Sequence, residues 1–229
     1  SFYGVLGSNG CRFFDPRVCS SITLRGHEII QQTKKWIETQ GFEVIYGDTD
    51  SVFVWVGDNK TESESQATGR QLASHLNRNW QQYLRQHFEL DCALEIEFET
   101  LYLQFLMPTI RNSTQGSKKR YAGVVASAEG DRLVFKGLEN VRTDWTRLAR
   151  EFQEELYRRV FHKEPFEDYV KALAARVLEG TENANLVYRK RLRRRLDEYE
   201  KNVPPHVQAG RLYAERGLDA PRRGSWVEY

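Results

Sequence analysis

The feature that most constrains this chain is a sharp polar turn between two short apolar runs that are rich in β-branched residues. Residues 43–46 and 52–56 have the composition of strands, and Gly47 with Asp48 supplies turn-forming residues between them. This pattern predicts a β-hairpin with Asp48 and Asp50 at or beside its tip. Because paired strands are stiff, we expect the two carboxylates to be held in fixed positions.

Two carboxylates one residue apart on a stiff turn are typical of a metal site. Mg²⁺ prefers hard oxygen ligands, and it commonly takes one or two carboxylates while water and phosphate complete its coordination shell. The pattern therefore predicts Asp48 and Asp50 as metal-binding catalytic residues of a phosphoryl-transfer enzyme. An ordinary solvated turn is the alternative, because aspartate is also a common turn former.

An amphipathic helical pattern stands on each side of the hairpin. The first begins with an N-cap at Asp15 followed by proline and continues to Gly41, and the second begins with a capping box at Thr61. Apolar and acidic residues then alternate, as in a strand with one buried face. Strands are predicted over residues 94–106, 120–126 and 132–136.

Beyond Trp145 the apolar residues recur at helical spacing, with breaks at Pro165 and Gly180. We therefore expect an α+β fold in which an antiparallel sheet is backed by helices and is followed by a mostly helical region. The boundary between these two domains is predicted near Val141.

The charge of the chain is unevenly distributed, although its formal net charge is only +2. Residues 1–110 contain 9 basic and 14 acidic side chains, whereas residues 111–223 contain 25 basic and 17 acidic side chains. This asymmetry predicts a protein that binds a polyanion along a basic surface and performs chemistry near an acidic one. Two ordinary domains with uneven surfaces would give the same asymmetry.

Several classes of protein are disfavoured by the composition. The three cysteines, Cys11, Cys19 and Cys92, are odd in number and form no Cys-x-x-Cys pair, so neither a disulfide framework nor a zinc knuckle is indicated. No apolar stretch approaches the roughly 20 residues that span a bilayer. The first residues also lack a basic region followed by an apolar core. We expect a cytoplasmic protein with reduced cysteines.

Four short motifs occur in an order that resembles the carboxyl half of a family B DNA polymerase. They are Ser-Phe-Tyr-Gly (1–4), Asp-Thr-Asp (48–50), Lys-Lys-Arg-Tyr (118–121) and Lys-Gly-Leu-Glu (136–139). Further blocks are similar to the bacterial branch of this family, and the resemblance runs from the first residue to the last. These blocks occupy residues 107–111, 187–194 and 202–207.

The resemblance implies a palm over residues 1–141, in which residues 1–12 follow the fingers helix, and a truncated thumb over residues 142–229. It implies DNA-directed DNA synthesis by nucleotidyl transfer, with two Mg²⁺ ions in the full-length enzyme. Asp50 would be a direct ligand of both ions, and Asp48 a further ligand or an electrostatic support. Glu99 would lie near the metals, although it could instead be an exposed residue on a polar strand face.

The resemblance also implies contacts with primer–template DNA and deoxynucleoside triphosphates. Tyr3 and Gly4 would lie against the nascent base pair, and a sliding clamp would be bound through a segment absent here. The basic residues would contact DNA, although charge runs are commonly only solvated. The predicted DNA-binding residues are Lys118, Lys119, Arg120, Tyr121, Lys136, Arg189, Lys190, Arg191, Arg193, Arg194 and Arg195, with the last six on a helix face or loop.

Part of the family's active site has no counterpart in this sequence. The Asp-x-x-Ser-Leu-Tyr-Pro strand that carries another metal-binding aspartate is missing. We therefore expect the isolated chain not to polymerise, whereas the full protein should, at the bacterial nucleoid, with an implied role in DNA repair and replication restart. A nonenzymatic DNA-binding module or another palm-type nucleotidyl transferase is the alternative, and the Lys-Lys-Arg-Tyr and Lys-Gly-Leu-Glu blocks argue against the latter.

Overall fold

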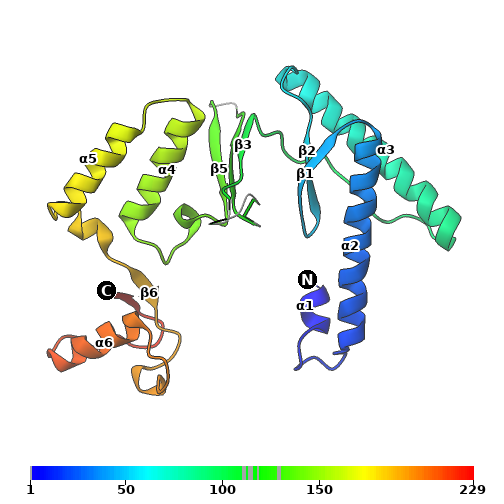
Figure 1. Cartoon of the computed structure of the whole chain (residues 1–229). Coiled ribbons are helices and arrows are strands. Elements are labelled where there is room, and N and C mark those ends of the chain that lie inside the picture. The colour runs from blue at the N-terminus through cyan, green and yellow to red at the C-terminus, as the bar shows by residue number, and fades with distance from the viewer. Residues whose placement is uncertain (1, 110–111, 113–115, 118, 128–129) are drawn as a thin grey trace. The chain divides into compact units, whose positions relative to one another are not determined.

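The computed structural model describes residues 2–109, 112, 116–117, 119–127 and 130–229 (Figure 1). The chain forms two compact units, Ser1–Leu101 and Tyr102–Tyr229. The predicted boundary near Val141 lies within the second unit, so the division into palm and thumb stays a prediction. Helices and antiparallel strands occur together, which confirms a mixed fold. The described strands form three separate sheets where a single sheet was expected.

The first unit contains helices α1 (Phe2–Leu6), α2 (Pro16–Thr39) and α3 (Glu62–Phe88). The carboxylate of Asp15 accepts a hydrogen bond from the backbone N–H of Arg17 at 2.9 Å and so caps α2. At the start of α3, Thr61 Oγ1 accepts from the N–H of Glu64, and the Glu64 carboxylate accepts from the N–H of Thr61. Both predicted helix starts are confirmed.

Strands β1 (Glu43–Asp48) and β2 (Ser51–Trp55) form the predicted antiparallel hairpin. The register shifts between Val44 and Tyr46, so Ile45 forms a bulge that bends β1. The hairpin packs on α2, since a Cβ atom built at Gly47 would lie only 3.5 Å from the side chain of Ile30. The end of the hairpin that carries the two aspartates is therefore supported by a helix.

Helices α2 and α3 are held together by an aromatic and apolar core. Trp80 is only 3% exposed, and its indole N–H donates a 3.1 Å hydrogen bond to the hydroxyl of Thr33. Trp36 lies edge-on against Trp80, with 4.9 Å between ring centroids. This core fixes the helix on which the hairpin rests. The other buried apolar residues of the two helices are Cys19, Ile37, Leu72 and Leu76.

The predicted strand over residues 94–106 is wrong for most of its length, because only β3 (Gln104–Leu106) pairs with another strand among the described residues. Burial still alternates from Cys92 to Glu99, with the acidic side chains exposed. The side-chain amide of Asn77 on α3 bonds both the N–H and the C=O of Ile96, each at 2.8 Å. Helix α3 therefore covers the apolar face of residues 92–99, and the amide of Asn77 supplies hydrogen bonds that a partner strand would otherwise make.

In the second unit, β3, β4 (Tyr121–Val125) and β5 (Arg132–Lys136) form an antiparallel sheet in this order. Helix α4 (Arg147–Phe161) packs on it, with the ring of Tyr157 edge-on to Phe135 at 5.6 Å. A 3₁₀ helix, η1 (Glu139–Val141), connects the sheet to the segment that leads into α4. The predicted strands here are confirmed. Their buried core consists of Ala122, Val124, Leu138 and Phe161.

The rest of the second unit is mostly helical but ends in a small hairpin. It contains α5 (Glu167–Leu178), the 3₁₀ helices η2 (Asn183–Leu186) and η3 (Leu196–Glu198), and α6 (Pro205–Glu215). Strands β6 (Arg189–Arg191) and β7 (Trp226–Glu228) pair antiparallel, and a core of Leu192, Val207 and Val227 lies between the hairpin and α6.

The expectation that the basic run lies on a helix face or loop is wrong for residues 189–191, which form β6. All three side chains of β6 are exposed, so the run has no alternation of apolar and polar residues. Its partner strand lies at the end of the sequence. Without a local pattern or a nearby partner, the sequence offers no signal for this strand.

Candidate active-site hairpin and nucleic-acid interface

The tip of the β1–β2 hairpin is strained. Asp48 pairs with Ser51 across the strands, so Thr49 and Asp50 form the tip, and the expected turn residue Gly47 lies within β1. The N–H of Asp50 donates to the C=O of Asp48 at 2.6 Å, which closes a three-residue γ-turn, and Thr49 has a φ of 55°. A left-handed φ is costly for a β-branched residue, so the surrounding structure must impose it.

The strained turn orients both predicted catalytic carboxylates. The hydroxyl of Thr49 donates to Oδ1 of Asp48 at 3.0 Å, and the hydroxyl of Ser51 donates to Oδ1 of Asp50 at 3.4 Å. Asp48 is half-buried and Asp50 is exposed. Each carboxylate can use further lone pairs on its oxygens, so the tip presents hard oxygen ligands from a fixed backbone.

The donor set at the tip fits Mg²⁺ in part. Two carboxylates match what Mg²⁺ commonly takes from a protein. Within the described ranges, no group of three or more His, Cys, Asp or Glu side chains is arranged to hold a metal ion. Glu99 is exposed in the segment that follows α3 and is not gathered with Asp48 and Asp50 into such a group. The assignment of these three residues as metal ligands stays a prediction.

Tyr3 and Gly4, the residues predicted to contact the nascent base pair, both lie on α1. The side chain of Tyr3 is 49% exposed, and a Cβ atom built at Gly4 would meet no atom within 4 Å. The contact of these two residues with the nascent base pair stays a prediction.

Two motifs that are distant in sequence form one junction in the second unit. Tyr121 of the Lys-Lys-Arg-Tyr block pairs with Lys136 of the Lys-Gly-Leu-Glu block across β4 and β5. Gly137 has a φ of 62°, and a Cβ atom there would collide with the carbonyl oxygen of Lys119. Only glycine fits this close backbone approach without strain. The two motifs are therefore in direct backbone contact. Lys118, the first residue of the Lys-Lys-Arg-Tyr block, lies outside the described residues.

An ion pair between Arg120 and Glu139 closes the same junction. Burial raises the pKa of the Glu139 carboxyl, but hydrogen bonds from the Gln153 amide, from the backbone N–H of Glu139 itself and from Arg120 outweigh burial and hold that pKa below its ordinary value. Glu139 therefore stays anionic at neutral pH and holds Arg120. The guanidinium of Arg120 thus has a structural partner, and its contact with DNA stays a prediction.

The ring of Tyr121 is fixed by an aromatic cluster that the sequence analysis missed. Phe105 lies 5.2 Å and Tyr102 lies 6.2 Å from Tyr121 between ring centroids. Tyr102 also covers Gly123, where a Cβ atom would collide with its ring. The cluster forms only when β3 pairs with β4, and that pairing is not visible in the sequence. Lys136 is exposed beside it.

Three cations of the basic run have partners in the structure. The guanidinium of Arg189 lies 5.4 Å from the ring centroid of Trp226 and forms a 3.4 Å ion pair with Glu228. Arg195 binds Asp197 through two hydrogen bonds of 3.1 and 2.9 Å. Arg191 donates through Nε to the carbonyl oxygen of Gly224 at 2.8 Å, which leaves its charge uncompensated.

The other three cations of the run, Lys190, Arg193 and Arg194, are exposed. Their side chains form no ion pair or hydrogen bond within the part of the chain that the structure describes. They are therefore available to an external anion.

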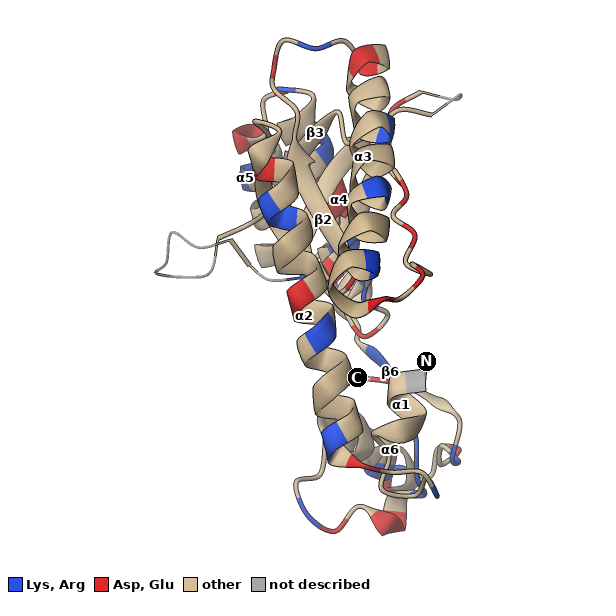
Figure 2. Ribbon diagram, turned by 90° about the vertical axis from the view of Figure 1, so that its right-hand side faces the viewer, with Lys and Arg blue, Asp and Glu red and all other residues tan. Residues whose placement is uncertain are grey.

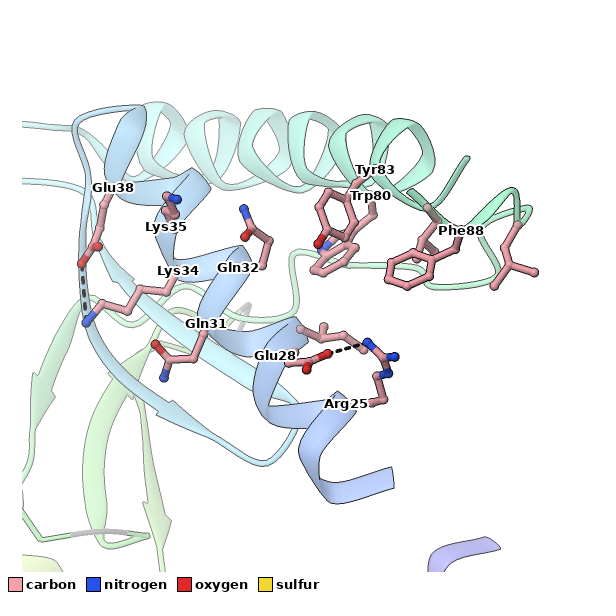
Figure 3. Close-up of a pocket in the computed structure, with 13 residues that line it drawn as sticks. Arg25, Glu28, Gln31, Gln32, Lys34, Lys35, Glu38, Trp80, Tyr83 and Phe88 are labelled. Carbon is pink, nitrogen blue, oxygen red and sulfur yellow. Dashed lines mark hydrogen bonds and ion pairs between the residues drawn. The ribbon is translucent and has the colours of Figure 1, made fainter. Parts of the chain in front are cut away.

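A cavity of about 670 Å³ opens between α2 and α3 (Figure 3). Trp80, Tyr83 and Phe88 line it on one side, and a 2.7 Å ion pair between Arg25 and Glu28 lies at its rim. None of the predicted site residues lines this cavity.

Among the described residues, no helix combines the length and the apolar character that crossing a membrane requires.

The exposed cations on and after β6 fit a surface that binds a polyanion. The model of the family "DNA polymerase family B" matches residues 1–229, and the chain belongs to this family. The chain is 54% identical to DNA polymerase II of Escherichia coli over 229 residues, which are 100% of this chain and 29% of that protein.

Two more distant relatives are also DNA polymerases. The DNA polymerase alpha catalytic subunit of Xenopus laevis is 26% identical, with 100% of this chain and 15% of that protein covered. The solved structure of the family B DNA polymerase from Pyrobaculum calidifontis is similar to this chain, with a TM-score of 0.54 and 27% sequence identity. The similarity covers 100% of this chain and 26% of the Pyrobaculum chain. The chain thus spans less than a third of the length of each of these relatives.

Proposed function

We propose that a protein containing this chain carries out template-directed DNA synthesis, adding deoxynucleotides from triphosphates to a primer end. The observation that carries the proposal is the strained Asp48–Asp50 hairpin in a chain that matches family B over residues 1–229. Strain of this kind persists where the surrounding structure over-determines the backbone, and it gathers at functional sites.

Asp48 and Asp50 would hold Mg²⁺ at the hairpin tip. When bound, divalent ions stabilise the attacking and leaving oxygens of a phosphoryl transfer. The chain's own contribution is orientation. The γ-turn fixes the backbone between the two carboxylates, and the hydroxyls of Thr49 and Ser51 each occupy one carboxylate oxygen. Packing of β1 on α2 keeps the tip in place, so the carboxylates need little rearrangement to meet a ligand.

The second unit would grip the primer–template duplex. Lys119, Tyr121 and Lys136 meet at the junction of β4 and β5, where Tyr121 is fixed by its aromatic neighbours. Contacts of this kind to phosphates and sugars position DNA without reading its sequence. The cations after β6 would add further phosphate contacts, and binding should weaken as the salt concentration rises.

The similarity to DNA polymerase II of E. coli supports a finer proposal, namely that the protein acts in DNA repair and replication restart. The isolated chain should not extend primers, because the sequence has no Asp-x-x-Ser-Leu-Tyr-Pro strand to complete the carboxylate set. Deoxynucleoside triphosphates, primer–template DNA and a sliding clamp are the proposed partners of the whole protein.

The test is Mg²⁺-dependent primer extension by the full-length protein that contains this chain. Asp50→Ala should lower the extension rate by at least about 10³-fold while duplex binding survives, because a ligand of the reacting centre is lost. Asp58→Ala is the matched control, since Asp58 is an exposed aspartate that follows the same hairpin outside the tip. If Asp50→Ala extends primers as fast as the control, the hairpin is only a turn, and a nonenzymatic DNA-binding role becomes the better account.

A further inference from the structure

Two arginine pairs that are distant in sequence come together at one end of the β6–β7 hairpin. Arg193 and Arg194 follow β6, and Arg222 and Arg223 precede β7. The hydrogen bonds of the hairpin continue beyond the strands into the connecting residues. Because the strands are antiparallel, the residues that leave β6 and those that enter β7 lie at the same end.

Backbone hydrogen bonds fix this arrangement at Leu192. Its N–H donates to the C=O of Ser225 at 2.9 Å, and its C=O accepts from the N–H of Gly224 at 2.8 Å. Arg193 directly follows Leu192, and Arg223 directly precedes Gly224, so the two arginines are neighbours across the hairpin end. Figure 2 shows Lys and Arg segments on and beside β6.

The segments that carry these arginines are held in place. The N–H of Arg194 donates to the hydroxyl of Tyr199 at 3.1 Å, and the N–H of Arg222 donates to the hydroxyl of Ser225 at 3.2 Å. Leu192 between them is only 1% exposed. The arginines therefore project from an ordered backbone, which reduces the entropy lost when they bind a ligand.

The cluster has no internal compensation for its charge. All four arginines are exposed, and within the described ranges their side chains form no ion pair or hydrogen bond. Arg191 adds a fifth positive charge, because its Nε is anchored to the carbonyl oxygen of Gly224 at the same end. Like charges held together repel one another, so an anion that bridges them should bind strongly.

We propose that Arg193, Arg194, Arg222 and Arg223 form a binding site for the phosphates of a DNA duplex. Guanidinium groups bind phosphate oxygens through paired hydrogen bonds, which suits adjacent phosphates on one backbone. The choice of duplex DNA as the ligand rests on the proposed function, in which this unit grips the primer–template. Arg222 and Arg223 lie outside every motif of the family resemblance, and only the fold joins them to the basic run.

The proposal is tested by binding of a blunt DNA duplex to the 229-residue chain over a series of salt concentrations. Arg222→Ala with Arg223→Ala should make the slope of log K against log salt shallower by about 1.8, at about 0.9 per phosphate contact. Arg222→Lys with Arg223→Lys keeps the charge and should retain the slope. Lys35→Ala with Arg85→Ala removes two exposed cations from the first unit and should leave the slope unchanged.

The outcomes separate this site from the proposed function. Wild-type binding with an unchanged slope in the Arg222/Arg223 double variant, shown to be folded by circular dichroism, overturns the site and leaves the Asp50 test of polymerase activity untouched. Equal losses for duplex DNA and for anionic lipid vesicles would also overturn it, because the cluster would then be a general anion patch. A loss confined to DNA, with the Lys35/Arg85 control intact, supports the site.

Discussion

Gly137 provides a sharp test of how the two motifs of the second unit are joined. Its φ of 62° is left-handed, and a Cβ atom there would collide with the carbonyl oxygen of Lys119. An alanine at such a φ costs about 1 to 2 kcal/mol, offset by about 0.4 to 1 kcal/mol of lost unfolded-state entropy. Relieving the collision would displace the backbone of one motif from the other, at about 1 to 3 kcal/mol more.

Gly217 is the matched control, because it has a similar φ of 70° but no atom within 4 Å of an added Cβ. Gly217→Ala should therefore cost only the strain less the entropic offset, about 0 to 1.6 kcal/mol, whereas Gly137→Ala should cost about 1 to 4.6 kcal/mol. Urea unfolding of both variants, compared at equal m-values, measures the difference. Equal losses in the two variants would refute the reasoning that a backbone collision joins the motifs.

Two further predictions concern stability. Hydrogen bonds from Arg158 and Arg159 outweigh burial and lower the pKa of Glu155 from 4.5 to about 2, so Glu155 should stabilise the fold above pH 4.5 and lose this effect as the pH falls toward 2. Urea unfolding of Glu155→Gln should show a loss of about 1 kcal/mol at pH 6 that vanishes near pH 2; a constant loss would contradict the ionic account. Asn77→Leu should cost about 2 to 4 kcal/mol, because the N–H and C=O of Ile96 lose their partners; hydrogen exchange at Ile96 that remains as slow as in the wild type would contradict this.

The elements that could be predicted from the sequence are those whose signals are local. The caps at Asp15 and Thr61 lie within three residues of the groups that they bond, so the helix starts were visible. The hairpin at residues 43–55 was visible for the same reason. The candidate catalytic pair followed from it, although the turn falls on Thr49 and Asp50, because Gly47 adopts an extended backbone within β1.

The elements that could not be predicted depend on partners that are far away in the sequence. Alternation over residues 92–99 correctly reports which side chains are buried, but it does not say whether a strand or a helix covers them. Here the cover is α3, and Asn77 supplies the hydrogen bonds of a missing strand. The pairing of β6 with β7 likewise joins segments that are far apart in the sequence. It could not be predicted from local patterns, and neither could the proximity of Arg193 and Arg223 that results from it.

Backbone outliers among the described residues coincide with two of the motifs that carry predicted site residues. Glu89 and Lys163 have left-handed φ values at the ends of α3 and α4, where this conformation is common. Two asparagines also have positive φ, which asparagine tolerates. The remaining non-glycine outliers among the described residues are Thr49 and Lys119. Each lies in a motif that the sequence singled out for chemistry or DNA contact, one in each unit, so local strain and predicted function coincide twice independently.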